Sequence, residues 1–341
     1  MLTKRLVALM LCGAAIGAAL SLTLAAAAAP PDATALPSTS TAVKNALKYL
    51  KSRQTRSGGF SAKGMSQSAA TPWVVMAVRA AGQDPAKWRR AGGKTPIQYM
   101  QGLDIERLAD GTTPKNPAAT YSKYILAYKA ARKTSLIRRA GRKRVDLVVK
   151  LLAYQDAASG RFTTAAGGKG SYAAISTTTY AVLALKAAGR ASAARSRAVQ
   201  WLRTQAHSSG GFSWNPGGSP DVDSTGAAIQ ALRAGGVSSS SGVIRGALKF
   251  MKAKQQRDGG FAYDFGGSVL ESSALAIQGI VAAGQDPAGA AWRRGGKSPV
   301  YYLCTMQARN GSFYHLGRIS ATPLLATSYA VMGLKNKKLP L

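Results

Sequence analysis

The sequence is poor in cysteine and histidine, and this shortage excludes several classes of site. It has 2 Cys and 2 His in 341 residues. Cys12 lies in an N-terminal apolar segment, so Cys304 has no partner for a disulfide once that segment is removed. Neither His207 nor His315 has other ligands at zinc-site spacing, and no Walker-type loop or paired CxxC is present. We therefore predict no metal and no cofactor, and a fold that is stabilised by burial.

Acidic residues are also scarce, with 13 Asp and Glu against 46 Lys and Arg and a formal charge of +33. Such a charge attracts anionic polymers and anionic lipid surfaces, and salt screens the attraction. The basic residues are spread along the whole chain, which favours a generally basic surface over a nucleic-acid interface. We expect the densest stretch, residues 129–150, to form an exposed connector and a helix face.

The N-terminus has the layout of a secretory signal peptide. Lys4 and Arg5 precede an apolar run over residues 6–29, which ends in alanines with an Ala-x-Ala site near Ala29. We expect cleavage rather than a retained anchor, because the run ends in small residues. No later segment is apolar and long enough to span a bilayer. The prediction is a secreted or envelope-associated protein with a signal peptide at 1–29, a Pro/Ser/Thr-rich linker at 30–40 and one domain at 41–341.

A motif of glutamine, a glycine-rich turn and phenylalanine recurs about every fifty residues. The glutamines are Gln54, Gln101, Gln155, Gln205, Gln255 and Gln307. Five copies end in a phenylalanine, and the copy at Gln101 lacks the glycine-phenylalanine ending. The glycines permit backbone angles that other residues resist, so the chain can turn tightly there.

Each repeat is expected to contain two helices. The segment before the glutamine carries an apolar stripe, as in Val243, Ala247 and Phe250. The segment after the turn is apolar on nearly all faces, as in residues 274–280, which is typical of a buried helix. No distinctive polar repeats mark the ends of the array, which favours a closed ring over an open solenoid. We predict an all-α ring of six helical hairpins with an outer and an inner layer.

This repeat resembles that of the prenyltransferase and squalene-cyclase superfamily. The resemblance covers residues 41–334 and is carried by the Gln-x3/4-Gly-Gly-Phe turns and the alternating helices. It implies an α/α toroid (an α6/α6 barrel), in which the glutamine and the aromatic residue tie neighbouring outer helices together. The motif ends in tryptophan in the cyclases and in phenylalanine here. The superfamily includes cyclases, lipid transferases and cobalamin-binding transport proteins, so the fold alone assigns no function.

The segment Pro220-Asp-Val-Asp-Ser-Thr225 is similar to the Asp-x-Asp-Asp-Thr signature of class II terpene cyclases. The resemblance gives Asp223 the role of protonating an alkene or epoxide, with Asp221 as the first aspartate of the signature. Ser224 departs from the third acidic position, and the chain has one ring where the triterpene cyclases have two helical domains. Protonating an alkene requires a carboxylic acid that stays protonated in a dry site. The alternative is that Asp223 only caps the helix that follows it.

A second carboxylate is predicted beside Asp223. Aligning Ala228-Ile-Gln230 with Ala276-Ile-Gln278 places Asp223 level with Glu271, so two adjacent inner helices would present carboxylates at one rim of the ring. Five of the 13 acids lie between residues 221 and 271. They are Asp221, Asp223, Asp258, Asp264 and Glu271. Such local acidity predicts a ligand or cation contact, or an acid pair.

Aromatic residues make up only 7% of the chain, and the inner helices supply few of them. We expect Trp73, Tyr124 and Tyr180 to line the central cavity, with Tyr121 and Tyr329 as the other inner-helix aromatics. A carbocation formed by alkene protonation would need such aromatic faces.

Three functions are open. The first is a secreted, non-catalytic binding module for a small, apolar ligand or a partner, which the incomplete acid motif and the low aromatic content favour. The second is a class II terpene-cyclase-like isomerase or lyase with Asp223 as the acid, and Glu271 and Asp221 beside it. The third is an envelope protein that binds anionic polymer or lipid through its charge. The sequence leaves the ligand, catalysis and the oligomeric state open.

Overall fold

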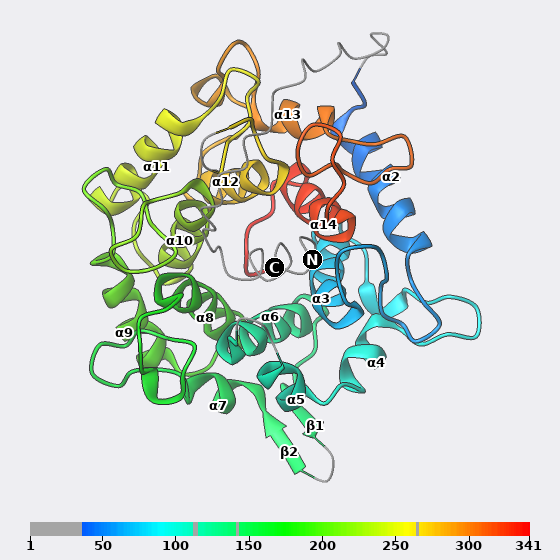
Figure 1. Cartoon of the computed structure of the whole chain (residues 1–341), viewed down its shortest axis with the longest axis vertical. Coiled ribbons are helices and arrows are strands. Elements are labelled where there is room, and N and C mark those ends of the chain that lie inside the picture. The colour runs from blue at the N-terminus through cyan, green and yellow to red at the C-terminus, as the bar shows by residue number, and fades with distance from the viewer. Residues whose placement is uncertain (1–35, 112–114, 141–142, 264–265) are drawn as a thin grey trace.

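A computed structural model describes residues 36–111, 115–140, 143–263 and 266–341. The predicted signal peptide, the first part of the predicted linker and Asp264 lie outside these residues. The described chain is helical apart from one two-stranded sheet and isolated bridges (Figure 1). None of its helices has the length and apolarity needed to cross a membrane.

Six helices of the described chain form the inner layer of the ring (Figure 1). They are α3 (Gln67–Ala80), α6 (Pro117–Ala130), α8 (Ala174–Ala188), α10 (Val222–Ala234), α12 (Leu270–Ala282) and α14 (Pro323–Leu334). Each contacts the next, and α14 contacts α3, so the ring is closed. Their side chains are apolar on most faces, which is why the helices are buried; every residue of α14 is buried.

The outer layer consists of amphipathic helices that bury one stripe against the inner layer. They are α2 (Thr39–Ser52), α4 (Pro96–Gln101), α7 (Leu147–Leu152), α9 (Ser192–Arg203), α11 (Gly242–Lys254) and α13 (Pro299–Thr305). Three short 3-10 helices lie in connections: η1 (Pro85–Lys87), η2 (Ala166–Gly168) and η3 (Ala290–Trp292). In α11, the buried stripe includes Ile244, Ala247 and Phe250. The predicted all-α toroid of six hairpins is confirmed.

Four of the repeated glutamines tie neighbouring outer segments together. Gln255 Nε2 donates to the carbonyl of Gly259 in its own turn, at 3.1 Å, and to that of Trp292 in the next unit, at 2.8 Å. The same two-way bonding occurs at Gln54, Gln155 and Gln307. The Gln307 bond reaches the carbonyl of Ala42 in α2, at 2.8 Å, and so joins the last unit to the first.

The five phenylalanines are fully buried, and each backbone N–H donates to a hydroxyl on an inner helix at 2.8 to 3.2 Å. The pairs are Phe60 with Thr71, Phe162 with Thr178, Phe212 with Thr225, Phe261 with Ser273, and Phe313 with Thr327. These hydroxyls lie 11 to 16 residues after the phenylalanine, and this uneven spacing hides them in the sequence. Each turn is therefore bonded to both layers.

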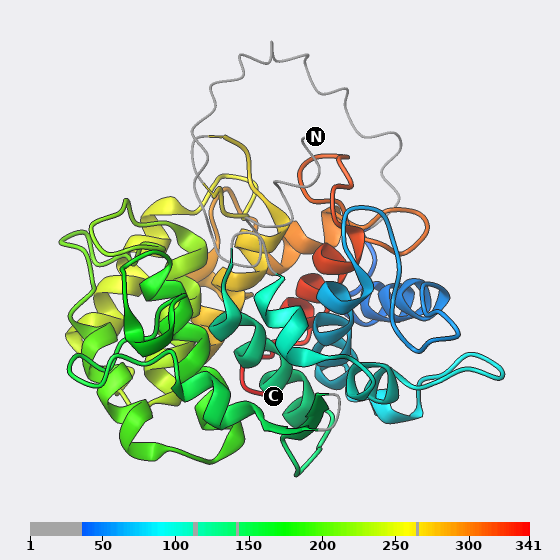
Figure 2. The same cartoon turned by 60° about the horizontal axis from the view of Figure 1, so that its bottom comes forward.

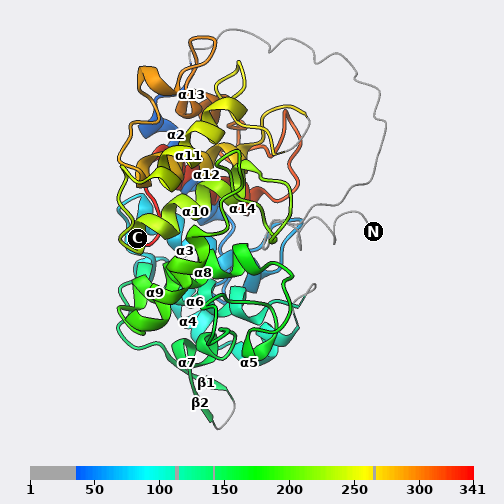
Figure 3. The same ribbon diagram turned by 90° about the vertical axis from the view of Figure 1, so that its left-hand side faces the viewer.

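Two segments differ from the expected repeat. After the exposed Gln101, helix α5 (Ile105–Asp110) follows in place of a glycine-phenylalanine turn. Within residues 129–150, an antiparallel hairpin of β1 (Ile137–Ala140) and β2 (Lys143–Asp146) precedes α7, where we expected a connector and a helix face. Side chains there alternate, since Leu136 and Arg138 are buried and Ile137 between them is exposed, as strands require. Figures 1 and 3 show the hairpin extending from the perimeter of the ring.

The C-terminal segment returns to the ring on the face opposite the acidic residues. Leu339 is buried, and its N–H donates to Gln230 Oε1 in α10 at 2.9 Å. Figure 1 shows this end of the chain near the centre of the ring, and Figure 2 shows it on the face opposite the loop that joins α13 to α14. That loop carries His315, so the C-terminal segment and the candidate site lie on opposite faces of the ring.

Candidate functional site

Helices α10 and α12 approach each other more closely than side chains would allow. A Cβ on Gly226 would lie 2.6 Å from the carbonyl oxygen of Leu275, and one on Gly279 would lie 2.9 Å from the Cα of Gly226. The two glycines thus let the backbones touch, which sets the first turns of α10 and α12 side by side. Asp223 lies in the first turn of α10 and Glu271 in that of α12. The structure therefore brings the two predicted carboxylates together.

Asp221, and not Asp223, is the N-cap of α10. Its Oδ1 accepts a hydrogen bond from the N–H of Ser224 at 2.6 Å, and its Oδ2 accepts one from the Ser224 hydroxyl at 2.8 Å. The alternative that Asp223 serves as the helix cap is wrong. The Oδ1 atom of Asp223 is buried without a hydrogen-bond partner, while the residue as a whole keeps partial exposure. Asp223 is therefore available for another role.

The surroundings of Asp223 favour its neutral form. Burial raises the pKa of Asp223 to about 7, and the negative charges of Asp221 and Glu271 act in the same direction. The Ser272 hydroxyl and His315 oppose this rise in pKa. At neutral pH, a large share of the molecules therefore carries Asp223 as a carboxylic acid.

His315 completes the cluster, and the sequence analysis missed this role. Its Nδ1 lies 2.8 Å from Oε2 of the buried Glu271, whose Oε1 has no hydrogen-bond partner. The N–H of Leu270 donates to the carbonyl of His315 at 3.0 Å, which fixes the loop against the start of α12. Burial lowers the pKa of His315, but the hydrogen bond and charge of Glu271, with the charge of Asp223, raise it above its usual value. His315 and Glu271 are 44 residues apart, so no local spacing signals the pair.

Three aromatic side chains from different inner helices meet near the acids. The ring centroids of Trp73 and Tyr329 are 5.1 Å apart, and those of Trp73 and Tyr180 are 6.4 Å apart. Burial raises the pKa of Tyr329 well above its usual value, and Tyr180 and the charges of Asp223 and Glu271 raise it further. Both carboxylates are therefore near enough to Tyr329 to affect the pKa of its hydroxyl. Tyr180 keeps partial exposure although it lies on an inner helix.

Other predicted residues lie elsewhere. Tyr124, which we expected to line the cavity with Trp73 and Tyr180, is fully buried. Its hydroxyl donates to the carbonyl of Ser68 at 2.9 Å, and its ring centroid lies 6.3 Å from that of Tyr128. Asp258 serves a turn, where it accepts hydrogen bonds from the N–H of Gly260 and the hydroxyl of Ser268. Among the residues that the structure describes, no group of three or more His, Cys, Asp or Glu side chains is arranged to hold a metal ion.

Residues 174–271, which include both Asp223 and Glu271, match the prenyltransferase alpha-alpha toroid domain. Over these residues, the match confirms the resemblance to the prenyltransferase and squalene-cyclase superfamily. The toroid is also similar to solved structures of two kinds of enzyme, type II terpene cyclases and glycosidases. A comparison with curated proteins finds no match to this chain.

The similar structures share the toroid at low sequence identity. The apo type II terpene cyclase MstE from Scytonema has a TM-score of 0.59 at 13% identity, over 87% of this chain and 97% of that one. Its complex with geranylgeranyl dihydroxybenzoate has a TM-score of 0.60, also at 13% identity and over the same shares. A glycosidase in complex with glucose has a TM-score of 0.56 at 16% identity, over 86% of this chain and 95% of that one. At these identities, the similarity shows the fold alone. Because this chain covers 97% of the MstE chain, a type II terpene cyclase can be about as small as this single ring.

Proposed function

We propose that this protein is an enzyme that protonates an apolar, unsaturated substrate of the isoprenoid class, with Asp223 as the proton donor. The observation that carries the proposal is the state of Asp223, a partly exposed carboxyl group with one buried, unpaired oxygen and a pKa raised to about 7. Burying an unpaired polar atom costs about 1 to 3 kcal/mol. A site that only binds apolar ligands gains nothing from that cost, whereas an acid catalyst needs a carboxyl that stays protonated.

The reaction that fits this site begins with addition of the Asp223 proton to one carbon of a substrate double bond. The π electrons form the new C–H bond, which leaves a carbocation on the adjacent carbon and a carboxylate on Asp223. Trp73, Tyr180 and Tyr329, whose rings contact one another, are the aromatic residues that we propose stabilise such a cation. Loss of a proton from a neighbouring carbon to the Asp223 carboxylate restores both a double bond and the acid, so the net reaction is an isomerisation.

The other residues of the cluster control the proton on Asp223. Burial, together with the charges of Asp221 and Glu271, raises the pKa of Asp223 and so favours its protonated form before substrate arrives. Asp221 is fixed by its cap bonds to Ser224, and Glu271 is fixed by His315. We assign Asp221, Glu271 and His315 as positioning residues and Asp223 as the catalytic one.

The test is turnover by the purified full chain across a panel of polyprenyl and polyprenyl-aromatic compounds, read by mass spectrometry. We expect one or more substrates to be converted, and Asp223→Asn to reduce turnover by about a hundredfold or more while the helical circular dichroism is unchanged. Asp258→Asn is the matched control, because Asp258 is an acid of the same region that is engaged in a turn. Absence of product across the panel, or equal turnover by Asp223→Asn, would refute the proposal.

A non-catalytic, secreted binding module is the second candidate. It is supported by Ser224, which stands at the third acidic position of the cyclase signature and is bonded to Asp221. Native mass spectrometry of the protein purified from the medium distinguishes the two candidates. An isoprenoid that co-purifies unchanged and is never converted would favour the binding module, whereas a protein retained in the cell would contradict secretion.

Envelope association through the basic surface is the third candidate and is supported by the charge of +33. Attraction of this kind is screened by salt. Release of the protein from cells at high ionic strength is the expected result, and retention at high salt would argue against it.

A further inference from the structure

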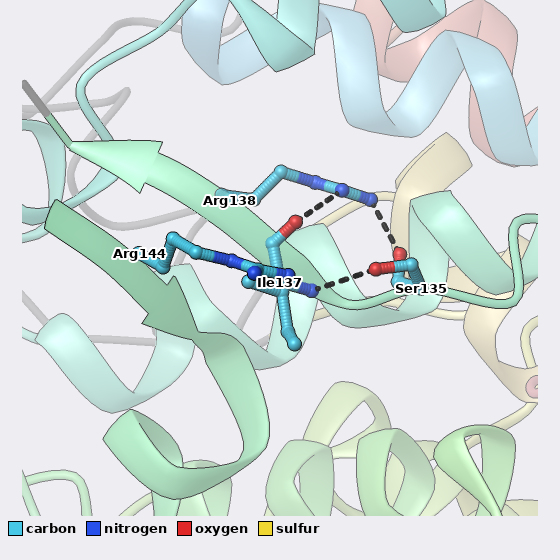
Figure 4. A pocket seen from close by; sticks show the side chains of 4 residues that line it. All are labelled: Ser135, Ile137, Arg138 and Arg144. Atoms are coloured by element: carbon cyan, nitrogen blue, oxygen red, sulfur yellow. Dashed lines mark hydrogen bonds between the residues drawn. The ribbon is translucent and has the colours of Figure 1, made fainter. Parts of the chain in front are cut away.

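A pocket of about 380 Å³ lies at the β-hairpin (Figure 4). Figure 1 shows this hairpin on the perimeter of the ring, away from α10. It is lined by Ser135, Ile137, Arg138 and Arg144. Arg138 belongs to β1, where it pairs with the buried Val145, and Arg144 belongs to β2, where it pairs with the next residue of β1. The two arginines therefore start from opposite faces of the hairpin, and both side chains reach the lining of this pocket. Figure 4 shows both arginine side chains extending toward Ser135 and Ile137.

Arg138 is held rigidly, yet its charge is not neutralised. Only 8% of the residue is exposed, and its guanidinium donates to the carbonyls of Ile137 and Ser135 at 2.7 and 2.8 Å. Its guanidinium carbon lies 3.7 Å from the centroid of the Tyr128 ring. The Nε atom is buried without a hydrogen-bond partner. Neutral carbonyls and a ring orient the cation but supply no counter-charge, and a buried charge is costly unless it is paired.

No acidic side chain in the described part of the chain forms an ion pair with Arg138 or Arg144. Asp146, the acid of the hairpin itself, is engaged elsewhere. It pairs with Arg190 at 2.8 Å and caps α7 through the N–H groups of Val148 and Val149. Among the described residues, the pocket therefore presents two arginines, one buried and one exposed, without an acidic partner.

We propose that this pocket binds the phosphate group of an organic phosphate. Guanidinium groups match the oxygens of phosphate in a bidentate manner, and a fixed guanidinium loses little conformational freedom on binding. Arg138 is already fixed by its bonds, and the exposed Arg144 completes the contact. Because the volume exceeds that of a bare phosphate, the pocket also accommodates the group that carries the phosphate. This site is separate from Asp223 and does not depend on the reaction proposed above.

The test measures binding of glycerol 3-phosphate to the full chain by calorimetry, and sedimentation with phosphatidylcholine vesicles with and without phosphatidic acid. We expect Arg144→Gln to weaken binding by about tenfold or more, since it removes a charge-assisted contact from an exposed side chain without disturbing the fold. Arg309→Gln is the matched control, because it removes the same charge from an exposed position outside the pocket. Dependence on Arg144 in the vesicle assay identifies a lipid headgroup, and dependence only in calorimetry identifies a soluble phosphate.

Arg138→Lys provides a second variant, which keeps the charge but removes the planar group stacked on Tyr128. We expect it to weaken binding with the net charge unchanged, which diffuse attraction cannot explain. The proposal is overturned if neither probe binds, or if Arg144→Gln and Arg309→Gln weaken binding equally.

Discussion

The turn after α11 and the acid cluster at the start of α10 and α12 treat polar groups in opposite ways. In the turn after α11, Gln255 donates to two carbonyls, and the N–H of Phe261 donates to Ser273. In the acid cluster, Asp223 and Glu271 each keep a buried oxygen without a hydrogen-bond partner. Buried polar groups that have hydrogen-bond partners stabilise a fold. A buried carboxylate oxygen without a partner costs stability, and this cost is expected where a residue is kept for its function. The comparison assigns the repeated motif to the scaffold and the unrepeated acids to chemistry.

The largest effect is expected in the scaffold. Phe261→Ala removes a fully buried ring between the two layers and should lower the free energy of unfolding by about 3 to 5 kcal/mol, as in other large-to-small core changes. Denaturant unfolding measures the loss, with Tyr301→Ala as the control at an exposed aromatic residue. A decrease in the free energy of unfolding of less than about 1 kcal/mol would show that the phenylalanine of the motif does not stabilise the toroid.

A smaller effect, with a pH dependence, is expected in the acid cluster. His315→Gln leaves the charge of Glu271 buried without its partner and should cost about 2 kcal/mol, less than a fully buried pair because His315 is partly exposed. The folded pKa of His315 is raised above 6.5, so this stabilisation is complete below pH 6.5 and is lost as pH rises through the folded value. Unfolding at pH 6 and pH 9 tests the sign, and a difference that grows toward pH 9 would contradict it.

The third effect, at Asp223, has the opposite sign. The pKa of Asp223 is about 7 in the folded protein against 3.8 for an ordinary aspartate, so the folded state loses stability as pH rises between these values. Asp223→Asn has no such loss, and it should raise Tm by a few degrees at pH 8 and leave it nearly unchanged at pH 4. Thermal melts of both proteins at the two pH values provide the measurement. Equal or lower stability of the variant at pH 8 would show that Asp223 is not destabilised by its site.

The scaffold could be predicted from the sequence because it is repeated, and part of the acid cluster followed from it. The shared Ala-Ile-Gln of α10 and α12 placed Asp223 level with Glu271, and the structure brings them together through Gly226 and Gly279. His315 could not be found in this way, because it lies in a loop that is not part of the repeat. Only the folded chain brings this loop against α12.

Side-chain direction was the second obstacle. A helix that is apolar all round gives no sign of which face points inward, so Tyr124 was expected to line the cavity, whereas the structure buries it fully with its ring centroid 6.3 Å from that of Tyr128. The strands around Arg138 could not be recognised in the sequence, because an arginine occupies the buried position and Ile137 the exposed one, so apolar and polar residues do not alternate there. Periodicity thus predicted the layers, but not the contacts that depend on the rotation of single helices.

The most direct test of the central claim is the reaction in D2O. A proton donated by an exchangeable Asp223 carboxyl must appear in the product as one deuterium on a carbon that was part of the substrate double bond. We expect mass spectrometry to show that single deuterium with the unmodified protein, and no product with Asp223→Asn. A product that carries no deuterium, or one formed equally by Asp223→Asn, would contradict proton transfer from this site.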